Sequence, residues 1–135
     1  MNEAININES IGNSTERIRE VVIGYINKSV TYANTTSFLI GYLPPNAYIV
    51  DIPVLQTTDF TDGVLDIGTS ASAARYVNDQ SLNASAGKQT VTSTAYWGVV
   101  ESTTEPTGVY GIVVATGTGL SAGALKVVVS YAFNE

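Results

Sequence analysis

Three aspartates lie close together in the chain with a glycine between two of them. Asp59, Asp62 and Asp66 follow the spacing D-x-x-D-G-x-x-D. Hard cations such as Ca²⁺ take several oxygen ligands, so an acidic loop that contains glycine can hold one. The spacing differs from that of the EF-hand loop, and Asp and Gly are also the ordinary residues of turns. We therefore favour a turn here and keep a cation site as the alternative.

Two glutamates could take part in glycoside hydrolysis. That reaction needs an acid and a base or nucleophile about 5–10 Å apart across a cleft. Glu101 and Glu105 are the only glutamates between Glu20 and the last residue, and both fall in a turn-rich connection. We interpret them as solvated loop charges.

The composition lacks the commonest catalytic side chains. The chain has no histidine and no cysteine, which removes the commonest general base, Ser-His and Cys-His nucleophiles, and thiolate metal sites. No GxSxG, Walker A or dinucleotide motif is present. The segment Gly117-Thr118-Gly119 has no predicted helix behind it to bind phosphate, so it is interpreted as a hairpin turn. The sequence thus predicts no catalytic, cofactor or metal residues and a protein that is not an enzyme.

Charge is sparse and acidic. Charged residues make up 13% of the chain and the net charge is -6, whereas a globular domain usually carries about 25% charge. The negative sign disfavours binding to nucleic acid and to anionic membranes. A surface of Thr, Ser, Asn and Gly suits packing against protein, because burying hydroxyls and amides costs less than burying charges.

No segment resembles a membrane span or a secretory signal. The first fifteen residues, MNEAININESIGNST, are polar and acidic, and no apolar run approaches the ~20 residues of a spanning helix. We expect a protein that is made in a cytoplasm and stays soluble unless it leaves within an assembly.

Short β-branched and aromatic runs separated by turn residues dominate the pattern. Strands are expected at 19–26, 30–33, 36–43, 47–56, 64–67, 90–100, 109–115 and 125–133. A turn is expected at 27–29, and 70–88 is expected to be a long surface excursion of small residues, with at most one helical turn near 71–76. The count of about seven or eight strands predicts an all-β, antiparallel, jelly-roll-like sandwich.

Two runs carry most of that prediction. In 47–56 both faces are apolar, which predicts a strand covered on both sides, and Pro53 predicts an incompletely paired edge or a bulge. In 125–133 an apolar residue recurs at every second position, which predicts one buried face. Tyr96 and Trp97 are adjacent in an expected strand, so their rings should point to opposite faces and one of them outward. The outward ring either packs in the core or contacts an interface or a ligand, and we favour the core.

The chain divides into residues 1–15 and residues 16–135. The second part is expected to form the single β-sandwich domain. The first part is either a frayed terminus or an extended arm that orders on a neighbouring subunit, because Ile5 and Ile7 stand at strand spacing. We adopt the arm for the domain description.

The run LPPNAYIVDIPV, the loop TTDF, the strand VLDIGTS and the terminal strand ALKVVVSY form a recognisable cassette between residues 43 and 131. It resembles a cassette of small virion structural proteins of tailed bacteriophages. The resemblance implies an all-β auxiliary head protein of the decoration or cement kind. Such a protein binds the major capsid protein on the capsid exterior at local three-fold positions, as a homotrimer, and clamps neighbouring capsid subunits. Ser72 stands where the cassette often has an acidic residue.

The resemblance leaves the contact surface to be located. We expect the contacts on 1–15 and on the loops 56–63 and 70–88. The alternatives are a tail, neck or fibre component of the virion, a carbohydrate-binding module with an exposed aromatic platform, and a hydrolase, which the missing His and Cys disfavour.

Overall fold

Nine strands and no helix are found in the residues that the computed structural model describes, which are 23–33, 36–82, 86–117 and 119–134. The strands are β1 (Ile23–Thr31), β2 (Phe38–Leu43), β3 (Ala47–Asp51), β4 (Val54–Thr58), β5 (Val64–Gly68), β6 (Val77–Ser81), β7 (Gly87–Gln89), β8 (Thr107–Val114) and β9 (Ala124–Phe133). The described part of the chain contains no helix with the length and hydropathy of a membrane span.

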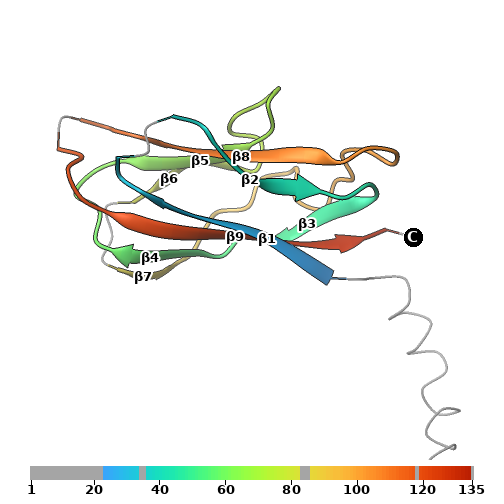
Figure 1. Ribbon diagram of the computed structural model, residues 1–135, viewed down its shortest axis with the longest axis horizontal. Coiled ribbons are helices and arrows are strands. Elements are labelled where there is room, and N and C mark those ends of the chain that lie inside the picture. The colour runs from blue at the N-terminus through green and yellow to red at the C-terminus, as the bar shows by residue number, and fades with distance from the viewer. Residues whose placement is uncertain (1–22, 34–35, 83–85, 118, 135) are drawn as a thin grey trace, which may run out of the picture.

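The strands form two antiparallel sheets that face each other (Figure 1). Sheet A has the order β1-β9-β4-β7, with β3 also paired to β9, and sheet B has the order β2-β8-β5-β6. The prediction of an all-β antiparallel sandwich is confirmed. Its jelly-roll-like connectivity stays a prediction.

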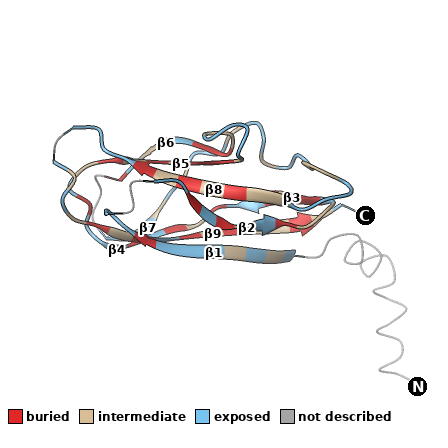
Figure 2. Cartoon of the chain, turned by 45° about the horizontal axis from the view of Figure 1, so that its top comes forward, coloured by how far each residue is buried: buried red, intermediate tan, exposed pale blue. Residues whose placement is uncertain are grey.

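The core lies between the two sheets, and Figure 2 shows buried positions on strands of both sheets. Alternate residues of each strand point inward, as period-two patterning requires. On β9 the prediction of a buried stripe is confirmed, since Leu125, Val127 and Val129 are buried. The stripe continues with half-buried Tyr131 and Phe133, whose rings meet edge to face with centroids 5.6 Å apart.

The segment expected as one strand at 47–56 is two strands, β3 and β4. Both pair with β9, and the register of β3 shifts between Ile49 and Asp51, so the irregularity of the ladder lies just before Pro53 and not at Pro53 itself. The expected cover on both sides is wrong. The inward residues include Ile49 and then, after the shift, Ile52 and Val54, whereas Val50 is exposed. The carbonyl of Pro53 still accepts a hydrogen bond from the Val128 amide at 2.9 Å, so the contact with β9 is kept between β3 and β4.

Three further expectations are wrong. β1 runs straight through the expected turn at 27–29, because pairing with β9 holds all nine residues extended. The region 70–88 contains β6 and most of β7, and Tyr76 and Leu82 within it are fully buried. The residues 90–100 do not form a strand and pass instead through a turn at 95–98.

The expected hairpin at Gly117 and Gly119 is also wrong, because the strands that flank it do not pair. β8 belongs to sheet B and β9 to sheet A, so this connection crosses from one sheet to the other. Local turn residues indicate where the chain bends but not which strand it joins next.

Candidate functional site

The three aspartates of the candidate cation loop do not converge. The Asp59 carboxylate accepts from the Ala86 amide at 2.5 Å, and the Asp66 carboxylate accepts from the Asp79 amide at 2.7 Å. Asp62 accepts from the Gly63 amide at 2.7 Å and from another loop. Within the described ranges, no three His, Cys, Asp or Glu side chains come together as a metal site. Each carboxylate instead joins a different pair of segments, and that of Asp66 joins strands β5 and β6.

Asp62 joins the β4–β5 connection to the β8–β9 connection. The hydroxyl of Thr116 donates to Asp62 Oδ1, and this bond, with smaller contributions from backbone amides, lowers the pKa of the exposed carboxyl. In the same place Thr61 donates to the Gly119 carbonyl at 2.5 Å and accepts from the Ser121 amide at 2.9 Å. The hydroxyl-rich loops are thus fastened to each other at one end of the sandwich.

Glu101 is not a solvated loop charge, so that expectation is wrong, whereas Glu105 is exposed as expected. Glu101 Oε2 accepts from Arg75 Nε and from the Tyr76 hydroxyl, each at 2.7 Å. Burial and the bond to Glu101 raise the pKa of Tyr76, and the bond to Glu101 raises that of Arg75. The Arg75 guanidinium also stands 3.9 Å from the centre of the Tyr96 ring.

Of the adjacent aromatic residues, one ring packs on the core and the other lies at the surface, although the two residues stand in a turn and not in a strand. Trp97 packs against the core and donates Nε1–H to the Tyr76 carbonyl at 2.8 Å. Tyr96 is exposed and lies under Arg75. We call Arg75, Tyr76, Tyr96, Trp97 and Glu101 the Glu101 cluster. It pins the connection after β7 to the connection before β6, which is a structural role that spacing in the sequence did not reveal.

A hollow of about 420 Å³ lies on the outer side of sheet B. The loop after β5 forms one wall through Thr69 and Ser70, and β8 forms the floor through Tyr110 and Ile112. The loop folds back so closely that a side chain at Gly68 would meet the Ser72 carbonyl at 2.0 Å. No titratable side chain except Tyr110 lines the hollow, so it offers shape and apolar contact and not acid–base chemistry.

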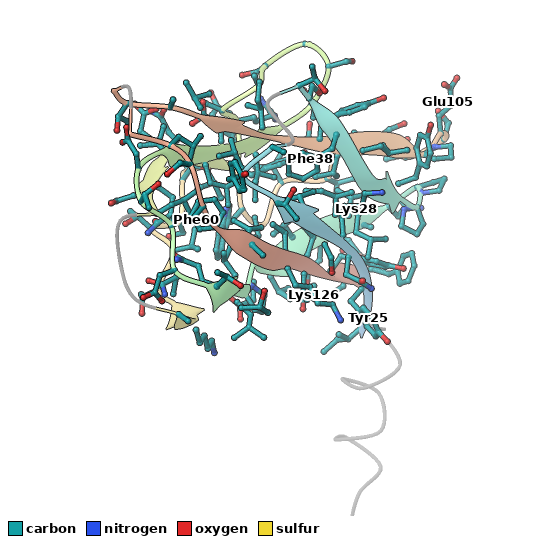
Figure 3. The ribbon with its side chains drawn as sticks, turned by 60° about the vertical axis from the view of Figure 1, so that its left-hand side comes forward. Tyr25, Lys28, Phe38, Phe60, Glu105 and Lys126 are labelled. Carbon is teal, nitrogen blue, oxygen red and sulfur yellow. The ribbon has the colours of Figure 1, made fainter. Side chains whose placement is uncertain are left out.

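The outer face of sheet A exposes large apolar side chains. Ile23 and Tyr25 on β1 are 70% and 67% exposed, and Val50 on β3 and Leu55 on β4 are also exposed. Figure 3 shows Tyr25 and Lys126 on the same side of the β1–β9 ribbon. Exposed aromatic and aliphatic residues gathered on one face are typical of a surface that contacts another protein.

The contact segments expected from the sequence are only partly loops. Residues 1–15 lie outside the described residues. The segment 56–63 begins within β4, where Gln56 is buried, and only its later part is a connection. Sequence reasoning missed the outer face of sheet A, because its members come from strands far apart in the chain. The alternation of residues within each strand indicates which side chains point outward. Finding that they form one face also requires knowing which strands are neighbours.

No protein-family model and no curated protein matches the chain. Among solved structures, it is similar to a chain of the cyanophage Pam1 capsid asymmetric unit, with a TM-score of 0.56, 22% identity and 84% of each chain covered. It is also similar to a chain of the capsid of Ralstonia phage GP4, with a TM-score of 0.61, 16% identity and 85% of each chain covered. The chain therefore has the fold of proteins found in two phage capsids, which confirms at the level of fold its resemblance to phage structural proteins.

Proposed function

We propose that this protein is a non-enzymatic virion component that decorates the exterior of a phage capsid. It binds the major capsid protein, bridges neighbouring capsid subunits and acts as a homotrimer, with assembly in the host cytoplasm. The observation that carries the proposal is the shared fold, which covers 84–85% of this chain and of each capsid chain.

The surface chemistry supports the proposal. The sandwich presents hydroxyl-rich loops at its ends and exposed apolar side chains on its sheet faces. Such a surface suits protein contact, because little charge must be desolvated. A protein that binds only the assembled shell stabilises it by mass action.

The proposal is tested by adding the full-length protein to shells of the phage that encodes it, prepared without it. We expect the protein to sediment with the shells and to raise the temperature at which they rupture. Its binding should saturate at one homotrimer for each three-fold position. Shells disassembled into capsid subunits should bind much less, because the bridging contacts exist only in the lattice.

Binding confined to the portal vertex or to tails would contradict decoration and support the neck or tail alternative. Binding to glycans with no affinity for shells would support the carbohydrate-binding alternative. A native mass that shows no three-fold assembly, in solution or on the shell, would contradict the homotrimer while leaving capsid binding intact.

A further inference from the structure

The outer face of sheet A carries a specific arrangement of charges on its apolar background. Register places Asp51 of β3 opposite Ser130 of β9. Four residues earlier on β9, Lys126 stands opposite Leu55 of β4. The same Leu55 stands opposite Lys88 of β7. One exposed carboxylate therefore lies toward one end of the face, and two lysines flank an exposed leucine toward the other end.

These charges have no partner within the described residues. The ion pair found there joins Arg75 and Glu101, in the Glu101 cluster. Among the described residues, the Asp51 carboxylate accepts a hydrogen bond from the amide of the next residue, Ile52, at 2.9 Å. Asp51 and Lys126 are too far apart to pair in one chain, because the four residues between their rows span about 13 Å.

A second copy of the same face supplies the missing partners. A two-fold axis that lies in the face, perpendicular to β9 and through Val128, exchanges the row of Ser130 with the row of Lys126. The Asp51 of one copy then falls over Leu55 of the other. Because neighbouring strands lie about 4.8 Å apart, Lys126 is one strand to one side of that carboxylate and Lys88 is one strand to the other.

From this self-complementarity we infer that two copies of the chain pack through the outer faces of sheet A about a two-fold axis. A two-fold contact uses the same patch on both partners, so each Asp51–lysine group occurs twice. Val128 lies at the axis. Val50 and Leu55, which are exposed in the single chain, become buried beside it when two copies pair. Stacked sheets lie about 10 Å apart, which leaves room for these side chains to meet.

This contact is separate from the three-fold contact of the proposed trimer. If the proposed function holds, neighbouring trimers on a shell meet across local two-fold axes, and the sheet A faces join them into a continuous net. That consequence rests on the proposed function, whereas the contact itself does not. Pairing through one such face therefore doubles the mass of the unit that the chain forms alone, and a trimer, which carries three such faces, can grow beyond that first doubling.

The test is sedimentation of the full-length protein over a range of concentrations up to millimolar. We expect a concentration-dependent doubling of the native mass. Asp51→Lys and the double variant Lys88→Glu/Lys126→Glu should each weaken this doubling at least about tenfold, as expected for close charge pairs at an interface. The triple variant, with all three charges exchanged, should recover most of the affinity.

Two controls separate the pairing from general effects. Lys28→Glu makes the same charge change on β1, where Lys28 pairs in register with inward-facing Val127 and not with the outer row, and it should leave the doubling unchanged. Asp51→Asn removes the charge but keeps an acceptor for Ile52, so it weakens the doubling without disturbing the turn.

Absence of any doubling at millimolar concentration would overturn the two-fold contact and leave the face to a different protein. Weakening in both charge variants without recovery in the triple variant would equally overturn the pairing of Asp51 with the two lysines. Shell binding that persists in either case would show that the proposed function stands while this inference fails.

Discussion

Replacing Glu101 by Ala should destabilise the protein far more than an exposed glutamate does. The change removes the acceptor of two hydrogen bonds of 2.7 Å and leaves the hydroxyl of Tyr76, a fully buried residue, without its partner. A bond to a charged group contributes about 1.5–3 kcal/mol and an orphaned buried donor costs about 1–3 kcal/mol. Glu101 and Arg75 keep 14% and 24% of their side-chain area exposed, so screening by water reduces their share.

The expected loss is about 2–3 kcal/mol in the free energy of unfolding. For a chain of this length, about 1 kcal/mol corresponds to roughly 3–4 °C, so the melting temperature should fall by about 7–10 °C. Circular dichroism measures the sheets, and fluorescence of Trp97, the only tryptophan, measures the cluster itself. Both are recorded at one fixed protein concentration, since assembly changes apparent stability.

Glu105→Ala is the matched control, because it removes the same charge from an exposed position in the same connection. It should change stability by no more than about 0.5 kcal/mol. The double variant Glu101→Ala/Tyr76→Phe should lose less than the sum of the two single losses, since both act on one bond. Equal melting temperatures for Glu101→Ala and Glu105→Ala would refute the structural role assigned to the cluster.

Three other predictions concern pH and packing. The pKa of Tyr76 is raised in the folded state, so its contribution to stability is fully present below pH 10.0, the ordinary tyrosine value. Above that pH the tyrosine of the unfolded chain loses its proton first, so the free energy of unfolding should fall by up to about 1.4 kcal/mol per pH unit. Tyr76→Phe should flatten this slope in urea titrations. The pKa of Asp62 is lowered in the folded state, so its contribution to stability is present above pH 3.8, the ordinary value. That contribution is lost as the pH falls through the folded-state pKa. Asp62→Asn or Thr116→Val should therefore reduce the dependence of the melting temperature on acid pH. Gly68→Ala forces a methyl group into the loop carbonyl above it and should cost at least about 1–3 kcal/mol in a thermal melt, whereas Gly119→Ala, with no atom closer than 3.9 Å, should melt close to the wild type. The Tyr76 prediction is contradicted if stability does not fall at alkaline pH, and the Asp62 prediction if the variants keep the wild-type dependence on acid pH. Equal melting temperatures for Gly68→Ala and Gly119→Ala would contradict the packing prediction.

Strand existence could be predicted where a strand's own residues carry the signal. The strands at 36–43, 64–67, 109–115 and 125–133 were expected from β-branched runs that alternate or end at glycine, and β2, β5, β8 and β9 confirm them. Alternation is a local property, because a strand with one buried face must repeat every two residues. The same logic failed at 27–29, where pairing along all of β9 outweighed the turn preference of Asn, Lys and Ser.

The weak strands were missed for the opposite reason. β6 and β7 are short and polar, and they exist because β5 and β4 offer edges to pair with. At 90–100 the residues have strand propensity, but no sheet edge receives them, and Trp97 packs its ring on the core from a turn. β-propensity reports fit to a half-buried surface and not a backbone preference, so it depends on a neighbouring strand.

The sequence by itself determined the class of the fold: an all-β, cysteine-free and histidine-free chain of low charge, with a run of strands that resembles a cassette of phage virion proteins. These properties are set by composition and by neighbours in the chain. Only the tertiary structure decided what the side chains do together. Glu101 reaches Tyr76 across 25 positions, and Asp51, Lys88 and Lys126 share one face because β9 pairs with both β3 and β4 while β7 pairs with β4. The physical reason is that strand pairing brings distant residues within about 5 Å of each other, and no local pattern states which strands will pair.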